Sequence, residues 1–238
     1  MTSNGSLNSP NFEVFSDHYD LNQTQIVWQQ LNLESVTIES VSRILKQENQ
    51  AFFVLESSEL GPAKGRYSII GMDPDLTWQF DGKSGYVIDE SGIKKEFDKK
   101  KCLSEFRKIV NDSTFDMPSH LPDMASGLIG YMAYDMIRLI ETSLEESKGD
   151  SIDIPEGLYM RITTSVVFDL KDDLIYLVKT VRPNPKLSSQ DAYDQAKKTL
   201  NHLHEAILES QKKPLESTLL PDDALDISFQ SNMGKDDF

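Results

Sequence analysis

The stretch GLYMRITTSVVFDLKDDLIYLVKTV, residues 157–181, decides the fold. It contains two runs, residues 157–170 and 174–181, that are rich in aromatic and β-branched residues, the types most enriched in strands. Lys171, Asp172 and Asp173 separate the runs, and Asp favours turns because its side chain bonds to the nearby backbone. The pattern therefore predicts a β-hairpin.

Further runs of the same kind lie nearer the N-terminus and share these residue types. They are AFFVLES (51–57), RYSIIGMDP (66–74), LTWQF (76–80) and GYVID (85–89). Turn-forming residues separate them, which favours antiparallel hairpins over parallel crossover units. Apolar residues recur every three or four positions in three other segments, which predicts helices near residues 35–50, 99–112 and 190–208. We predict an α+β fold, in which antiparallel β-sheets pack with helices.

The composition limits the classes of partner. A formal net charge of −15 repels phosphate backbones and anionic lipid headgroups, so we expect neither nucleic acid nor membrane as a partner. The opening residues lack a signal-peptide pattern, and no run approaches the roughly 20 apolar residues that a spanning helix needs. The single cysteine, Cys102, excludes an internal disulfide, which is consistent with a reducing, cytoplasmic location.

The distribution of polar residues suggests four regions. Residues 1–24 mix polar residues and scattered aromatics without a period, which indicates a flexible arm. Residues 25–210 carry the strands and helices, and residues 211–230, which contain two prolines and several acidic residues, resemble a linker. The final segment SNMGKDDF, residues 231–238, has the cap and acidic residues typical of a helix start.

Several residue groups could suggest chemistry but have simpler explanations. The GKS at residues 82–84 ends like a phosphate-binding loop, but Thr77 stands where that motif requires glycine, so we predict a hairpin turn. Asp169 could join the two aspartates of the 171–173 turn in a cation site, although turn chemistry explains them better. Cys102 lies on the apolar face of its helix, which favours a core residue over a nucleophile.

Four segments, taken in order, resemble the N-terminal region of anthranilate synthase component I, a chorismate-using enzyme of tryptophan biosynthesis. They are VLES (54–57) followed by Ser68 at a fixed interval, GRYSIIGMDPDL (65–76), GLIGYMAYDMIRLIE (127–141) and SNMGKDDF (231–238). The resemblance covers residues from about 25 to 238. It implies that residues 25–210 form that protein's N-terminal domain, and that residues 231–238 begin its chorismate-binding domain.

The resemblance also implies a site for L-tryptophan as a feedback inhibitor. Glu56 would bind the ammonium group, Ser57 and Ser68 would bind or orient the carboxylate, and Tyr67 would wall the slot for the indole ring. From the residues alone, the alternative is that Glu56 only pairs with Arg66 across a hairpin.

The family's lyase reaction uses magnesium held by glutamates in a C-terminal domain whose segments do not appear in this sequence. We therefore expect no catalytic residue, cofactor or metal site in this chain, no activity of the chain alone, and apolar surface that the missing domain would cover. The implied partners are L-tryptophan, that domain and a glutamine amidotransferase subunit. The alternatives are component I of aminodeoxychorismate synthase, on the folate route, and a stand-alone amino-acid-binding module. An interaction scaffold for the amidotransferase subunit is a further alternative.

Overall fold

The computed structural model describes residues 9–33, 36–48, 51–57, 65–141, 143–144, 154–212 and 234. In this part of the chain, eight strands form one antiparallel sheet. The strands are β1 (Gln25–Asn32), β2 (Phe52–Leu55), β3 (Tyr67–Phe80), β4 (Ser84–Asp89), β5 (Lys94–Asp98), β6 (Gly127–Met132), β7 (Gly157–Asp169) and β8 (Leu174–Val181). The antiparallel pairing and the hairpin predicted over residues 157–181 are confirmed.

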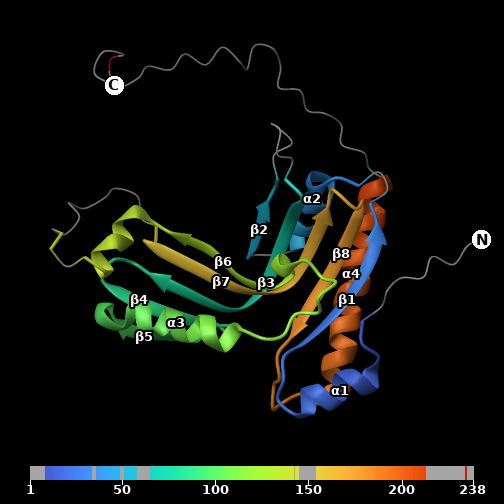
Figure 1. The fold of residues 1–238 in the computed structure, drawn as a ribbon, viewed down its shortest axis with the longest axis horizontal. Helices are drawn as coiled ribbons and strands as arrows, with labels where there is room; N and C mark the ends of the chain where they lie inside the picture. The colour runs from blue at the N-terminus through green and yellow to red at the C-terminus, as the bar shows by residue number, and fades with distance from the viewer. Residues whose placement is uncertain are drawn as a thin grey trace, which may run out of the picture.

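Two long strands, β3 and β7, pair with each other along their whole length and are shared by two halves of the sheet (Figure 1). In the first half-sheet, the order is β1-β8-β7-β3-β2. In the second half-sheet, β6 pairs with the beginning of β7, while β4 pairs with the end of β3 and β5 follows. Each long strand therefore changes its outer neighbour midway.

The change of neighbour falls at an irregularity in β3. The register with β7 shifts between Pro74 and Leu76, so Asp75 is an extra residue, and Asp73 adopts a left-handed conformation with φ of 52°. Such bulges bend a strand and increase its twist. The sequence suggested two strands, residues 66–74 and 76–80, but they are two parts of this one bent strand.

Four α-helices and three short 3₁₀ helices occur in the described residues. They are α1 (Phe12–Asp20), α2 (Ile38–Glu48), α3 (Cys102–Ser113), α4 (Ser189–Lys212), η1 (Lys99–Lys101), η2 (Asp123–Ala125) and η3 (Tyr134–Leu139). The three predicted helices are thus confirmed as α2, α3 and α4. Thr37 and Ser40 cap α2 reciprocally, because each side-chain oxygen accepts from the other residue's backbone N–H.

Residues 12–20 correct the prediction of a flexible arm over residues 1–24. They form α1, whose N-terminus is capped by the Asn11 side chain. Phe15 is fully buried, and its ring centroid lies 5.1 Å from that of Tyr193 in α4. Phe15 and Tyr19 lie one helical turn apart and are both buried, so they anchor α1 to the rest of the fold.

The main core lies between the first half-sheet and the helices α1, α2 and α4. The apolar periodicity of residues 190–208 predicts a buried stripe on this helix, and its five residues are all buried in α4: Ala192, Ala196, Leu200, Leu203 and Ile207. They pack against Val27, Val166 and Leu177 of the sheet. Fully burying each large aliphatic side chain contributes about 1.5–3 kcal/mol, so this face supplies a large share of the stability.

Smaller clusters cover the rest of the sheet. On the opposite face of the first half-sheet, Trp28, Ile69 and Val167 pack beneath Leu121 and Ala125, which precede β6. In the second half-sheet, the cluster consists of Trp78, Phe80, Phe97, Cys102, Ile109 and Met136. Cys102 is fully buried, and burial raises the pKa of its thiol to about 12, which confirms the core interpretation over that of a nucleophile.

Two of the predicted regions lie mostly outside the described residues. The linker predicted from residue 211 begins inside α4, which continues to Lys212, and residues 213–230 lie outside the description. Of residues 231–238, only Gly234 is described. None of the helices in the described ranges combines the length and apolarity needed to span a membrane.

Candidate functional site

The candidate site lies where β2 ends and β3 begins. The last ladder pair joins Leu55 to Ile69, and two further hydrogen bonds extend the contact beyond it. The Ser57 amide donates to the Ser68 hydroxyl oxygen at 3.0 Å, and the Ser57 hydroxyl donates to the Tyr67 carbonyl oxygen. The structure therefore brings Ser57 and Ser68 together.

The Ser57 and Ser68 hydroxyl groups differ in the hydrogen bonds that each can still donate. The Ser57 hydroxyl has one proton, which the Tyr67 carbonyl accepts, so Ser57 ties the two chain segments together. Ser68 is 2% exposed and its oxygen accepts from the Ser57 amide. Among the described residues, no partner accepts the Ser68 hydroxyl proton, so Ser68 keeps a donor for another group.

Tyr67 and Ser68 lie on opposite faces of β3, because side chains alternate along a strand. Tyr67 packs with Ile69 in the cluster beneath residues 121 and 125, whereas Ile70, two residues beyond Ser68, faces the helices. Tyr67 is the first residue of β3. A single ligand could therefore contact both side chains only by wrapping around the end of the strand.

Glu56 is exposed and forms no hydrogen bond or ion pair with any residue in the described part of the chain. The alternative that Glu56 pairs with Arg66 is wrong, because Arg66 binds two aspartates at the β7–β8 turn instead. The Glu56 carboxylate thus remains available at the end of β2, next to the Ser57 link.

Arg66 is held by a carboxylate in the β7–β8 turn. Its Nε and Nη2 atoms donate to Asp169 at 3.0 and 2.7 Å, and Nη2 also lies 2.7 Å from Asp172. Asp169 additionally accepts the backbone N–H groups of Lys171 and Asp172. Burial alone would raise the pKa of Asp169, but these hydrogen bonds outweigh it and hold the pKa below its ordinary value.

The same contacts account for the aspartates that could suggest a cation site. Asp169 satisfies the turn backbone and Arg66, as the turn interpretation predicted. Within the described ranges, no group of three or more His, Cys, Asp or Glu side chains could hold a metal ion. The GKS segment likewise forms the β3–β4 turn, as predicted, with Gly82 at φ 92° and Asp81 accepting the following amides.

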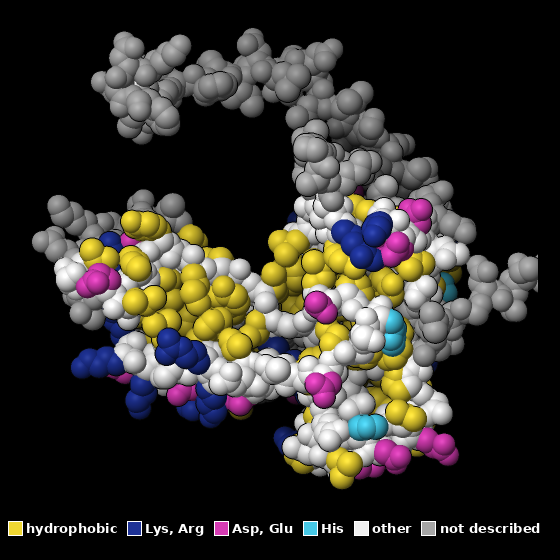
Figure 2. All heavy atoms as spheres, viewed as in Figure 1, with side chains coloured by type: hydrophobic (Ala, Val, Ile, Leu, Met, Phe, Trp, Pro, Cys, Tyr) yellow, Lys and Arg dark blue, Asp and Glu magenta, His cyan; other side chains and the backbone are white. Residues whose placement is uncertain are grey.

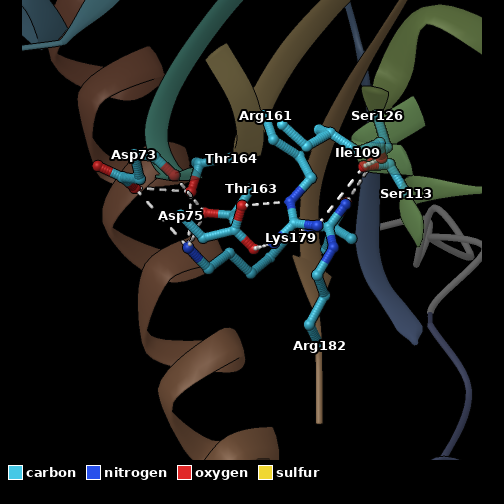
Figure 3. A network of polar contacts seen from close by, with 11 residues as sticks. Asp73, Asp75, Ile109, Ser113, Ser126, Arg161, Thr163, Thr164, Lys179 and Arg182 are labelled. Atoms are coloured by element: carbon cyan, nitrogen blue, oxygen red, sulfur yellow. Dashed lines mark hydrogen bonds and ion pairs between the residues drawn. The ribbon is translucent and has the colours of Figure 1, made fainter. Parts of the chain in front are cut away.

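A second polar cluster, which the sequence reasoning missed, lies at the bend of the sheet. We call it the bend network: its charged residues are Asp73, Asp75, Arg161, Lys179 and Arg182, and Thr163 and Thr164 join them (Figure 3). The aspartates come from the β3 bulge, Arg161 from β7, Lys179 from β8, and Arg182 directly follows β8. Charged residues inside otherwise apolar strands were the available sequence signal.

In the bend network, one carboxylate binds two guanidinium groups. Asp75 accepts from Arg161 Nε at 2.7 Å and Nη2 at 3.2 Å, and from Arg182 Nη1 at 3.2 Å. All three side chains are 14–16% exposed. Burial lowers the pKa of Arg182 despite the attraction of Asp75, and its buried Nη2 atom has no hydrogen-bond partner in the described structure.

The other half of the bend network fixes the bulge itself. The Thr163 hydroxyl donates to the Asp73 carbonyl oxygen and the Thr164 hydroxyl to the Asp73 carboxylate, both at 2.6 Å. Lys179 Nζ donates to both threonine oxygens at 2.8 and 2.9 Å. Burial lowers the pKa of Lys179, an effect that nearby Asp73 opposes. These contacts keep the left-handed Asp73 in place.

A groove of about 720 Å³ lies elsewhere, along β1. Its walls come from α1, β1, the end of α3 and the chain that follows α3, and include His18, Trp28, Asp112, Phe115 and Asp116. The candidate residues at the end of β2 do not line it. It therefore has no part in the site described above.

Fold and site together define an α+β domain on a bent antiparallel sheet, with carboxylate and hydroxyl groups gathered where β2 ends and β3 begins. No protein-family model matches the chain. Anthranilate synthase component 1 of Cereibacter sphaeroides is 33% identical over 192 residues, which make up 78% of this chain and 37% of that protein. The Acinetobacter calcoaceticus protein of the same name is 30% identical over 185 residues, 74% of this chain and 35% of that protein.

The protein of that name from Saccharomyces cerevisiae is 24% identical over 198 residues, 83% of this chain and 36% of that protein. Anthranilate synthase component I from Streptococcus pneumoniae, a solved structure, superposes with a TM-score of 0.46 at 25% identity, covering 77% of this chain and 37% of that one. The sequence matches show that the chain is related to anthranilate synthase component 1. It spans little more than a third of the length of these relatives.

Proposed function

We propose that this chain is the tryptophan-sensing part of an anthranilate synthase component I, which converts chorismate and glutamine or ammonia to anthranilate and pyruvate in the cytoplasm. The observation that supports it is the exposed Glu56 carboxylate, which has no partner among the described residues and lies beside the Ser57–Ser68 link, in a chain related to that protein. The proposal keeps Glu56, Ser57, Tyr67 and Ser68 as the inhibitor site.

In this proposal, each residue has a distinct role in binding a free amino acid. Glu56 binds the ammonium group through a charge-assisted hydrogen bond. Ser68 offers its remaining hydroxyl proton to the carboxylate, while Ser57 holds the two segments together rather than contacting the ligand. The Tyr67 ring borders the indole where the ligand passes the end of β3, and the nearby apolar side chains exclude water.

In this proposal, the chemistry of the reaction belongs to the part of the relatives' length that this chain does not span. The described residues contain no carboxylate cluster that fits Mg²⁺, so we assign neither the metal nor a catalytic residue to them. The ammonia source would be a glutamine amidotransferase subunit, and no described residue is assigned to that contact.

The second half-sheet carries a large exposed apolar surface. Hydrophobic side chains gather in the region where Figure 1 places β6 and η3, as Figure 2 shows. Tyr134 is 91% exposed and Ile140 72%, and Tyr131, Met132 and Ile137 are also exposed. In a protein as long as the relatives, we propose that the chorismate-binding domain covers this surface.

We expect the 238-residue chain alone to self-associate through this surface. Replacing Tyr134 and Ile140 with serine should shift its size-exclusion elution toward the monomer and reduce the fluorescence of a bound hydrophobic dye several-fold. Ile93, which is 68% exposed in the β4–β5 turn, provides the matched control, because Ile93→Ser should change neither measurement. A wild-type chain that elutes as a monomer and binds no dye would contradict the proposed surface.

The experiment that tests the proposed function is a titration with L-tryptophan. Because the chain spans little more than a third of the length of its relatives, we propose that the site lacks contacts supplied by the chorismate-binding domain, and we expect weak binding with a Kd on the order of 1 mM. The NMR signals of the Glu56, Ser57 and Ser68 amides should shift, and Glu56→Gln should weaken binding about fivefold or more by removing the partner of the ammonium group.

Glu205→Gln, which removes an exposed carboxylate on α4, provides the control and should leave the Kd unchanged. The proposal fails if tryptophan shifts none of these amides, or if Glu56→Gln binds as well as the wild type. A micromolar Kd measured by calorimetry would instead favour a self-contained amino-acid-binding module.

A further inference from the structure

The β7–β8 turn is joined to the residue before β3 by three kinds of contact. Asp169 binds Arg66 through two guanidinium nitrogens, Asp172 binds it through one, and the Leu170 amide donates to the Arg66 carbonyl oxygen at 2.9 Å. The side chain of Asp169 is 1% exposed, and Arg66 also stacks over the Tyr67 ring, with 4.7 Å between Cζ and the ring centroid. The turn therefore fixes where residue 66 lies.

Residue 66 in turn fixes the candidate site. The next carbonyl along the chain, that of Tyr67, accepts the Ser57 hydroxyl, and the next side chain, Ser68, accepts the Ser57 amide. The β2 ladder has already ended at Leu55, so these two bonds hold the segment that carries Glu56. A movement of residues 66–68 would therefore move Glu56 as well.

Gly65 allows the chain before Arg66 to pack closely against Ser57. A Cβ atom on Gly65 would overlap with the side chain of Ser57, so the chain before Arg66 runs directly against the segment after β2. Ser57 is thus in contact with Gly65, with the Tyr67 carbonyl oxygen and with the Ser68 hydroxyl oxygen.

We propose that Asp169 is a positioning residue of the amino-acid site, which acts through Arg66 without contacting the ligand. The inference rests on the proposed function, because it concerns the same site. Asp169, rather than Asp172, carries this role because its carboxylate is buried and bound by two nitrogens and two backbone amides, whereas the side chain of Asp172 is 49% exposed. Exposed ion pairs contribute little to stability. Charge-assisted hydrogen bonds to a buried carboxylate instead fix the position of the arginine that donates them.

The test compares Asp169→Asn with Asp172→Asn, which remove one carboxylate charge each from the same arginine. Amide hydrogen exchange of the 238-residue chain, without ligand, reports the Ser57 amide directly. We expect Asp169→Asn to speed exchange at Ser57 about tenfold and to raise the Kd for L-tryptophan about fivefold. Asp172→Asn should change either quantity by less than about twofold.

A third variant covers the outcome in which Asp169→Asn does not fold, which α4 amide exchange would reveal. Arg66→Lys keeps the charge but cannot make the two-nitrogen contact, and because the Arg66 side chain is 42% exposed, the fold should tolerate the change. Arg66→Lys should also speed exchange at Ser57 while leaving α4 exchange unchanged.

The two proposals fail in different ways. Absence of tryptophan binding by the wild-type chain would overturn the proposed function, while Ser57 exchange would still decide the role of Asp169. Unchanged Ser57 exchange in the folded Asp169 and Arg66 variants would overturn the positioning role, whatever the wild type binds. Equal effects of Asp169→Asn and Asp172→Asn would also overturn it.

Discussion

Replacing Asp75 with alanine should lower the free energy of unfolding by about 3–5 kcal/mol. Asp75 is the carboxylate that binds both Arg161 and Arg182, and all three side chains are at least four-fifths buried. Its removal leaves two guanidinium groups at the bend without their counter-charge, and burial already lowers the pKa of Arg182. Urea denaturation followed by tryptophan fluorescence would measure the change.

The control for this prediction is an exposed pair. Arg43 and Glu39 lie one turn apart on α2, 3.5 Å from each other, with side chains 55% and 67% exposed. Glu39→Ala should cost less than about 1 kcal/mol, because solvent screens such pairs. If Asp75→Ala costs no more than Glu39→Ala, the bend network does not stabilise the sheet as described.

Replacing Trp78 with alanine should lower the free energy of unfolding by a similar amount, about 3–5 kcal/mol. Trp78 is fully buried in the second half-sheet, where its ring centroid lies 4.8 Å from that of Phe106 and 6.3 Å from that of Tyr159. Truncation leaves a cavity among rigid aromatic neighbours that cannot collapse fully. The loss should appear as a lower urea midpoint with an unchanged slope, and circular dichroism would measure both.

Trp78→Phe separates the contribution of packing from that of polarity. The buried Trp78 Nε1 atom has no hydrogen-bond partner in the described structure, so phenylalanine removes an unpaired donor together with part of the ring. Because an unpaired buried donor is itself unfavourable, this variant should lose less than half of what Trp78→Ala loses. Equal losses in the two variants would contradict this account.

Much of the fold follows from local patterns in the sequence. In α2 and α4, the apolar residues recur at a spacing that predicts one buried face on each helix. Both faces are buried in the main core. The strands β2, β3, β4, β7 and β8 are rich in β-branched and aromatic residues, and turn residues lie between them. The strongest local signals thus belong to the elements around the main core.

Two of the elements that were missed, β5 and α1, have weak local signals. In β5, Phe97 is the only buried residue among charged ones, so the strand has neither a clear alternation nor an apolar run. In α1, the two buried aromatic residues lie in a polar segment. They are buried by packing against α4, which is distant in the sequence. The pattern in residues 99–112 predicts an apolar face with Cys102, Leu103, Phe106, Ile109 and Val110, which is wider than the buried face of α3, since Val110 is 40% exposed.

The candidate site was only partly accessible from the sequence. The family resemblance implied that Ser57 and Ser68 belong to one site, and the structure joins the two residues by a hydrogen bond. The partner of Arg66 could not be found in this way, because Asp169 lies about a hundred positions away and becomes a neighbour only through the β3–β7 pairing. The bend network depends on that same long-range pairing, with residues contributed by three strands.

The shared pair of long strands has a consequence for how the chain folds during synthesis. β3 ends at Phe80, but its partner begins only at Gly157, so the ribosome must make everything between them before the central ladder can close. At about 5–20 residues per second, the β3–β4–β5 meander would wait several seconds with one edge unpaired. This nascent state is where we expect molecular chaperones to matter most for the protein.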